Sequence, residues 1–256
     1  MSSSGLTILI PTFNESRNIR EAIECARFAE EILVVDSFST DGTAEIARQM
    51  GARVMEHEYI NSATQKNWAI PQATCDWVMI LDADERIPAE LQQEIRDFVT
   101  NPGPDAALRI RRSSFFMGQP IRYSGWQDDS VLRVFPRDRG RYVDREVHAD
   151  AVVDGPARLA QYKLDHYTFD SFEQYMRKFD RYTTWAAGDR AKKTRRVTAV
   201  HLLGRPVWRF FKQYILRLGI LDGRAGIIVC MLAAFSVFLK YAKLWERQQK
   251  DDSSQP

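Results

Sequence analysis

Short apolar runs alternate with helix-like segments over the first third of the chain. The runs predict buried strands at residues 6–10, 32–35 and 77–81, because each is apolar and is followed by a proline or an acidic residue. Between the strands, apolar residues recur at helical spacing after Asn14, which we expect to cap that helix, and again over residues 43–50. This order predicts an α/β fold, with a mostly parallel central sheet flanked by helices.

Polar residues follow directly on these three predicted strands. In chain order they are Thr12-Phe13-Asn14-Glu15, Asp36-Ser37 and Asp82-Ala83-Asp84-Glu85. In open α/β sheets, ligands bind in the crevice at the carboxyl ends of the strands. We therefore expect these polar residues to form one site.

Asp82 and Asp84 are candidates for metal-assisted chemistry. Carboxylate oxygens suit Mg²⁺ and Mn²⁺, and phosphate and water commonly complete the coordination shell. A metal held there would neutralise charge on a departing nucleoside diphosphate. The alternative is a solvated acidic turn before a helix at Pro88. Asp36 also has two possible roles. It can bind a base or ribose hydroxyl, or it can cap the next turn.

The composition and periodicity of the rest of the chain change twice. Residues 106–164 are rich in Arg, Gly and aromatic residues, with strand-like runs at 108–110 and 131–135, and we expect them to face an acceptor. From Phe172 onward the pattern is helical. Residues 225–239 carry no charge. This run is shorter than the roughly 20 residues of a comfortable membrane span, so it predicts a membrane-surface or re-entrant segment, or a helix buried against the protein.

Charge is distributed unevenly, although the net charge is only +2. Residues 1–189 carry 22 Lys/Arg against 30 Asp/Glu, residues 190–250 carry 14 against 2, and the last six residues add two acids. A basic end that also contains Trp208 and Phe210 is typical of segments that bind anionic membrane surfaces. Nucleic acid is the alternative partner, but the acidic donor side and the apolar run argue against it.

Three scattered cysteines and no visible signal peptide predict a reducing compartment.

Three motifs occur in an order that is far more specific than any one of them. They are Ile10-Pro11-Thr12-Phe13-Asn14-Glu15, then Val34-Val35-Asp36-Ser37 with Ser39-Thr40-Asp41-Gly42-Thr43, then Leu81-Asp82-Ala83-Asp84-Glu85. This resembles the family 2 glycosyltransferases, whose nucleotide-binding α/β domain is called GT-A. One branch, the bacterial lipopolysaccharide core glucosyltransferases, is also similar at Gly125-Trp126, Asp129, Leu132-Arg133-Val134-Phe135 and Val147-His148.

The resemblance implies a role for each matching residue. The donor-binding positions are Pro11, Thr12, Phe13, Glu15, Asp36, Lys66, Asn67, Asp82, Ala83 and Arg133. Asp84 is implied as a ligand of Mg²⁺ or Mn²⁺, together with His148. Asp129 matches the catalytic base best, with Asp128 beside it as the alternative. The Glu that usually follows His148 is missing here, where Ala149 and Asp150 follow. His166 lies in a similar block but has no assigned chemistry.

The implied reaction is an inverting transfer of a hexose, glucose by resemblance, from a UDP-sugar to a lipid-linked saccharide such as lipopolysaccharide core. Two alternatives stay open: transfer to a polyprenyl phosphate, which needs no base for a hydroxyl, and a catalytically inactive nucleotide-sugar-binding membrane scaffold. A dinucleotide-dependent oxidoreductase is disfavoured, because no Gly-x-Gly-x-x-Gly follows the first strand.

The predicted organisation has three parts. Residues 1–189 form the GT-A domain, with a donor half at about 5–105 and an acceptor half at about 106–189. Residues 190–250 form a basic and apolar helical segment that associates with a membrane, and residues 251–256 form a polar tail. The expected location is the cytoplasmic face of the inner membrane, as a peripheral or re-entrant protein.

Overall fold

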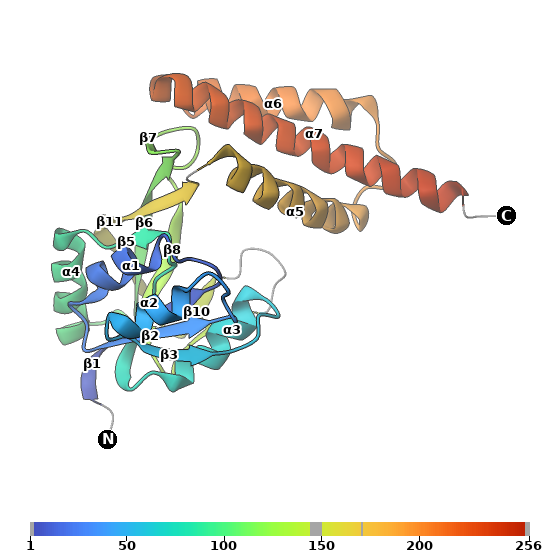
Figure 1. The fold of residues 1–256 in the computed structure, drawn as a ribbon. Helices are drawn as coiled ribbons and strands as arrows, with labels where there is room; N and C mark the ends of the chain where they lie inside the picture. Colours follow the sequence, from blue (N-terminus) through green and yellow to red (C-terminus); the bar gives the residue numbers. More distant parts are fainter. Residues whose placement is uncertain (1–2, 144–149, 170, 254–256) are drawn as a thin grey trace. The chain divides into compact units, whose positions relative to one another are not determined.

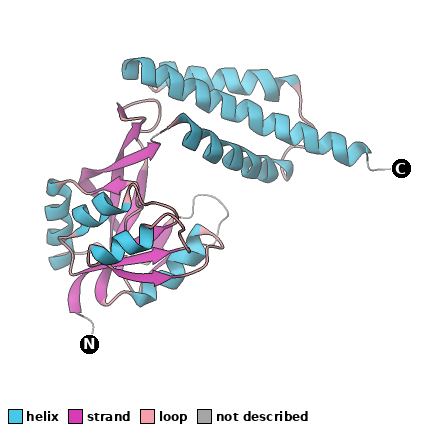
Figure 2. Cartoon of the chain, viewed as in Figure 1, coloured by secondary structure: helices cyan, strands magenta, loops and turns pink. Residues whose placement is uncertain are grey.

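The computed structural model describes residues 3–143, 150–169 and 171–253. The chain forms two compact units. The first contains the chain up to Ser113 together with Asp129–His166, and the second contains Ser114–Asp128 and the chain from Tyr167 onward. Figures 1 and 2 show the helices and strands of both units.

The N-terminal half of the sheet is parallel. Its strands are β1 (Ser3–Thr12), β2 (Glu31–Asp36), β3 (Arg53–Glu56) and β4 (Cys75–Ile80), in the spatial order β3-β2-β1-β4. Leu9 of β1 lies between Leu33 of β2 and Ile80 of β4, and all three side chains are buried. The three predicted apolar runs are thus the buried centre of this sheet.

The remaining strands are antiparallel, and they make the sheet mixed rather than mostly parallel. They are β5 (Glu85–Arg86), β6 (Ala107–Phe116), β7 (Gln119–Ile121), β8 (Ser130–Pro136) and β11 (Ala157–Phe169). β8 pairs antiparallel with both β4 and β6, and β11 pairs antiparallel with β5. Parallel pairing needs a crossover, usually a helix. No helix lies between β6 and β11 in the described part of the chain, so these strands return directly.

Helices cover both faces of the sheet in the first unit. They are α1 (Ile19–Ala26), α2 (Thr43–Gln49), α3 (Ser62–Ala69), a 3₁₀ turn (Ile70–Gln72) and α4 (Ala89–Thr100). Ile8 and Ile10 of β1 join the core that contains Ile23 of α1, whereas Leu9 joins the core that contains Ala63 of α3. This alternation follows from the two-residue period of a strand, and the α/β fold class predicted from the sequence is confirmed.

Asn14 does not cap α1, contrary to the expectation from the sequence. The residue at the N-cap is Asn18, and Asn14 has a left-handed backbone with φ of 55°. Its side-chain oxygen accepts a hydrogen bond from the backbone N–H of Thr40 at 2.9 Å, and its own N–H donates to the Ser39 hydroxyl at 2.8 Å. Asn14 therefore ties the loop after β1 to the loop after β2.

The second unit is mainly helical. It contains α5 (Phe172–Ala191), a helical run formed by Val200–Gly204, α6 (Arg205–Phe211) and Lys212–Leu216, a 3₁₀ turn (Gly219–Asp222) and α7 (Gly223–Ser253). A small antiparallel pair, β9 (Gly140–Tyr142) with β10 (Ala151–Val153), belongs to the first unit.

The units do not divide the chain at residue 189, where the sequence placed a boundary. Phe179 of α5 stacks on Phe235 of α7 with ring centroids 5.7 Å apart, so α5 joins the C-terminal helices. Phe116 and Ile121, at the tip of the β6–β7 hairpin, form a buried cluster with Val229 of α7. Because of these contacts, α5 and the hairpin tip belong to the second unit.

Candidate functional site

The carboxyl ends of β1 and β2 meet as the sequence predicts. The backbone carbonyl of Thr12 accepts a hydrogen bond from the N–H of Ser37 at 2.9 Å. The Thr12 hydroxyl donates to the Asp36 carboxylate at 3.1 Å. Asp36 is buried and also accepts bonds from the backbone N–H and the hydroxyl of Ser39, at 2.7 and 2.6 Å. The Asp36 carboxylate thus holds the turn after β2, which is the capping role that the sequence left open.

A cluster of charged side chains lies beyond the end of β4. Asp82 contacts three cations: Arg133 at 2.7 Å, Lys66 at 3.4 Å and Arg112 at 3.6 Å. Glu85, which is fully buried, pairs with Arg112 at 2.9 Å and also with Arg133. We call Lys66, Asp82, Glu85, Arg112, Asp129 and Arg133 the charge cluster.

Ion pairs keep Asp82, Arg133 and Lys66 charged despite their burial. Burial alone would raise the pKa of Asp82, but Arg133, Lys66 and Arg112 hold that pKa well below its usual range. Burial would lower the pKa of Arg133 and of Lys66, yet the Asp82 carboxylate raises both. At neutral pH Asp82, Lys66 and Arg133 are therefore ionised and mutually compensated.

Asp129 joins this cluster and Asp128 does not. Arg112 Nη1 lies 3.2 Å from Asp129 Oδ2 and its Nη2 lies 3.6 Å from Asp82 Oδ2, so one guanidinium contacts both carboxylates. The Asp128 carboxylate instead pairs with Arg217 in the second unit. The structure thus separates the two candidate bases that the sequence could not distinguish.

The loop before Asp129 is fixed by the C-terminal helices. The Asp222 carboxylate accepts bonds from the backbone N–H groups of Arg122 and Tyr123, at 2.9 and 3.0 Å, and from the Ser124 hydroxyl at 3.1 Å. Ser124 is fully buried, and its carbonyl accepts a bond from the Gln213 side chain at 3.0 Å. A side chain at Gly219 would meet the Ser124 hydroxyl at 2.7 Å, so the backbones approach closely there.

Asp84 lies next to a histidine that the sequence left without a role. His166 Nε2 on β11 is 3.7 Å from Asp84 Oδ2. In the described residues no group of three or more His, Cys, Asp or Glu side chains is placed to hold a metal. A metal bound at Asp84 and His166 would therefore take its other ligands from a phosphate group and water. His148, the expected second ligand, lies outside the described residues.

The other predicted donor residues take different positions at this edge. Phe13 is exposed, Pro11 is half-buried, and Ala83 is buried with its carbonyl accepting a bond from Arg86 at 2.8 Å. Glu15 accepts a bond from the Asn18 side chain at 2.7 Å. Asn67 uses its amide on the backbone of Tyr142, donating to the carbonyl at 2.9 Å and accepting from the N–H at 2.8 Å. Its observed contacts hold β9 in place.

One buried donor in the cluster points to a ligand. The Nε of Arg133 is buried and has no hydrogen-bond partner in the described part of the chain. An unsatisfied buried donor costs about 1–3 kcal/mol. An oxygen of a bound diphosphate is the kind of acceptor that would satisfy it.

Glu85 and Arg112 escaped the sequence analysis as functional residues. Glu85 was visible only as the end of the acidic motif, and Arg112 stands in an arginine-rich run on β6. The ion pair between Glu85 and Arg112 depends on β8 pairing with β4 on one side and with β6 on the other. For Arg112, the sequence signal was limited to a charged residue in an otherwise half-buried strand.

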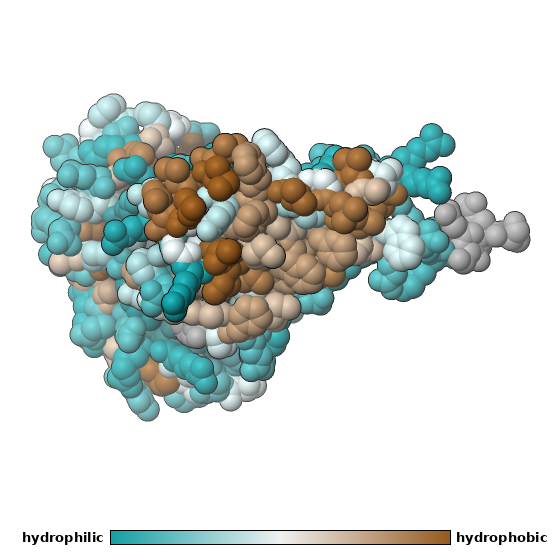
Figure 3. Space-filling model, turned by 90° about the horizontal axis from the view of Figure 1, so that it is seen from above, coloured by the Kyte–Doolittle hydropathy of each residue, from teal (hydrophilic) through white to brown (hydrophobic). Residues whose placement is uncertain are grey.

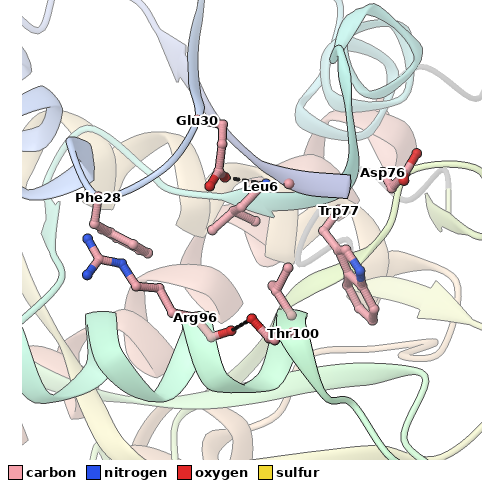
Figure 4. A pocket seen from close by; sticks show the side chains of 9 residues that line it. Leu6, Phe28, Glu30, Asp76, Trp77, Arg96 and Thr100 are labelled. Atoms are coloured by element: carbon pink, nitrogen blue, oxygen red, sulfur yellow. Dashed lines mark hydrogen bonds between the residues drawn. The ribbon is translucent and has the colours of Figure 1, made fainter. Parts of the chain in front are cut away.

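A pocket of about 400 Å³ lies at the opposite, amino end of the strands (Figure 4). Leu6 of β1 and Trp77 of β4 line it, together with Phe28, Glu30 and Arg96. Thr12 ends β1 and Asp82 comes after the carboxyl end of β4, so the charge cluster lies at the other ends of these strands and the pocket is separate from it.

Several known proteins of similar sequence are named glycosyltransferases. The profile of the family described as glycosyl transferase family 2 matches residues 7–153. A relative from Rickettsia felis, named an uncharacterized glycosyltransferase, is 29% identical over 255 residues, covering 94% of this chain and 89% of the relative. The lipopolysaccharide core biosynthesis glycosyltransferase LpsC from Rhizobium meliloti is 27% identical over 250 residues, covering 94% of this chain and 92% of the relative.

A solved structure shares the fold. Mannosyltransferase PcManGT from Pyrobaculum calidifontis, in complex with GDP-Man and Mn²⁺, matches with a TM-score of 0.58 and 18% identity, covering 94% of this chain and 87% of that one. At this identity the likeness bears on the fold alone, and it confirms GT-A. Because the family profile spans more than half of the chain, this protein belongs to glycosyl transferase family 2 and is a glycosyltransferase.

Proposed function

We propose that this enzyme transfers a hexose, glucose, from a UDP-sugar to a hydroxyl of a lipid-linked saccharide such as lipopolysaccharide core. The observation that carries the proposal is that Asp82 and Asp129 contact one guanidinium, Arg112, with Asp84 two residues from Asp82. A donor-side motif and an acceptor-side acid thus meet at one edge of the sheet. The motif resemblance supports the UDP donor, and the name of the LpsC relative supports the acceptor class.

The charges of the site favour a divalent metal, Mg²⁺ or Mn²⁺. The charge cluster contains three carboxylates, from Asp82, Glu85 and Asp129, and three cations, from Lys66, Arg112 and Arg133. These charges cancel, so the cluster offers a nucleoside diphosphate no net positive charge. Asp84 and His166 have the oxygen and nitrogen donors that fit such an ion. When bound, the ion neutralises negative charge on the departing diphosphate.

Asp129 acts as the general base in this proposal. It accepts the proton of the acceptor hydroxyl as the hydroxyl oxygen bonds to the anomeric carbon and the bond from that carbon to the UDP oxygen breaks. A single displacement of this kind inverts the anomeric configuration and forms no sugar–enzyme bond. Arg112 fixes the direction of the Asp129 carboxylate, because it contacts Oδ2 at 3.2 Å.

The location follows from the acceptor and from the C-terminal helices. In the described part of the chain, the helical segment Gly219–Lys250, which contains most of α7, is long and apolar enough to cross a membrane by length and composition alone. A lipid-linked acceptor brings the enzyme to a membrane, and we place it at the cytoplasmic face of the inner membrane. The basic segment would contact anionic lipid, and nucleic acid is not an expected partner.

Donor binding tests the proposal directly. We expect wild-type protein to bind one UDP-sugar in a panel of nucleotide sugars, measured by calorimetry with Mn²⁺, with Mg²⁺ and with EDTA. Asp84→Ala should weaken metal-dependent binding by about 10–100-fold or more, because even outer-shell partners of a metal contribute that much. The matched control is Asp97→Ala, which removes an exposed carboxylate on α4.

The outcomes separate the alternatives. Donor binding that needs metal in wild type and is lost only in Asp84→Ala supports the proposal. If no nucleotide sugar binds under any metal condition, the proposed chemistry is wrong and only the family membership stands. Binding without transfer to any acceptor extract would favour the inactive scaffold.

A further inference from the structure

We propose that the second compact unit lies flat on an anionic bilayer, with α6 and α7 parallel to the membrane surface and neither helix crossing it. This deepens the membrane location given above and rests on the proposed function only for the identity of the membrane. The evidence comes from the exposure, charge and packing of the C-terminal helices.

An apolar face runs along these helices (Figure 3). Exposed large apolar side chains recur every three or four residues in the helical run around α6 and again in α7, so they gather on one side of each helix. The apolar face comprises Val200, Leu203, Val207, Trp208, Phe211, Ile215, Ile227, Ile228, Met231, Phe235 and Phe238. Val207 is 68% exposed and Met231 is 56% exposed, which is unusual for residues that gain free energy by leaving water. Contiguous patches of this kind mark protein or membrane interaction sites.

Cations on the same helices identify an anionic bilayer as the occupant. Arg205, Arg209, Lys212, Arg217 and Arg224 are all exposed. Residues 190–250 carry 14 Lys/Arg against 2 Asp/Glu. One of these acids, Asp222, is turned to the hairpin backbone. Anionic lipid attracts such a surface, whereas a second copy of this unit would bring the same cations together.

The packing of α7 argues against a membrane span. Lys243 of α7 pairs with Asp180 of α5 at 2.7 Å, and Arg205 of α6 contacts the Tyr241 hydroxyl of α7. If α7 crossed the bilayer, its neighbours would carry these charges into the hydrocarbon, where charged side chains are strongly disfavoured. With the helices flat, the apolar face enters the acyl boundary and the cations stay at the level of the headgroups.

Vesicle flotation of the full-length chain tests the charge and the apolar face separately. We expect at least tenfold stronger binding to vesicles of phosphatidylcholine with 30% phosphatidylglycerol than to phosphatidylcholine alone. Arg209→Gln with Lys212→Gln should weaken binding about 30-fold, which corresponds to about 1 kcal/mol per cation. Val207→Glu with Met231→Glu should weaken binding by at least tenfold.

Matched controls lie in the first unit. Arg27→Gln with Arg48→Gln removes the same charge from exposed positions, and Leu159→Glu places an acid at an exposed apolar position. These variants should bind within about twofold of wild type. Circular dichroism of every variant confirms that the fold is kept.

Terminal tags on full-length protein added to sealed vesicles distinguish a flat helix from a span. A flat arrangement leaves both the N-terminal and the C-terminal tag open to external protease. A protected C-terminal tag would show that α7 crosses the bilayer and overturn the proposal. Equal binding to neutral and anionic vesicles, or a stable dimer broken by Val207→Glu with Met231→Glu in the absence of lipid, would also overturn it. The flotation and tag experiments use no donor and no acceptor, so their failure leaves the glycosyl transfer proposal untouched.

Discussion

Replacing Asp129 with asparagine is expected to lower the rate of glycosyl transfer by about 10²–10⁴-fold while leaving UDP-sugar binding within about twofold of wild type. Asparagine keeps the size of the side chain but cannot accept the proton of the acceptor hydroxyl. The Arg112 contact at 3.2 Å is made by an oxygen that asparagine can still present, so the local fold should survive. Transfer is measured as UDP release that depends on added acceptor.

Asp128→Asn is the matched control for this prediction. Asp128 is the neighbouring residue, carries the same charge, and pairs with Arg217 at an exposed position of the second unit. Surface ion pairs contribute little to stability, about 0–1 kcal/mol. We expect Asp128→Asn to retain transfer within a few-fold of wild type. The opposite ranking of the two variants would make Asp128 the base. Unchanged transfer in Asp129→Asn would favour a polyprenyl phosphate acceptor, whose phosphate oxygen needs no base.

The sequence predicted the meeting of the strand ends at Thr12, Asp36 and Asp82 better than the position of Asp129, because strand ends depend on local sequence. Strand ends are encoded by nearby residues, such as the apolar run that ends at Asp82, and parallel strands bring their carboxyl ends together. The same reasoning placed Asp36 at this edge. It could not decide whether the carboxylate meets a nucleoside or caps the turn, because the Thr12 hydroxyl, which also binds Asp36, approaches it only in the folded chain.

The acceptor side depends on pairing between distant strands. Asp128 and Asp129 directly precede β8, and the pairing of β8 with β6, which sets Ser130 opposite Arg111, brings Asp129 close to Arg112. The antiparallel course of β6 and β8 was foreseeable in part, because residues 106–164 contain no helical pattern that would carry a crossover. The contact between Asp84 and His166 joins residues 82 positions apart, and no local sequence pattern predicts it.

Glu85→Gln is expected to destabilise the protein by about 3–5 kcal/mol, the largest stability effect that we predict. The Glu85 carboxylate is fully buried and lies between Arg112 and Arg133. A neutral amide leaves two cations near Asp82 with one carboxylate fewer to compensate them. The amide NH₂ group also has to turn away from both guanidinium groups, because all of them are donors. The change is measured by urea denaturation followed by near-ultraviolet circular dichroism.

Glu24→Gln gives the comparison that isolates burial. Glu24 pairs with Arg27 at 2.9 Å on α1, and both side chains are more than half exposed. Its removal should cost less than about 1 kcal/mol, because solvent already screens the pair. Equal effects of the two substitutions would show that the charge cluster does not depend on Glu85. A large loss confined to Glu85→Gln would mean that this acid, which follows the two donor-side aspartates in the sequence, holds the arginines that present the site.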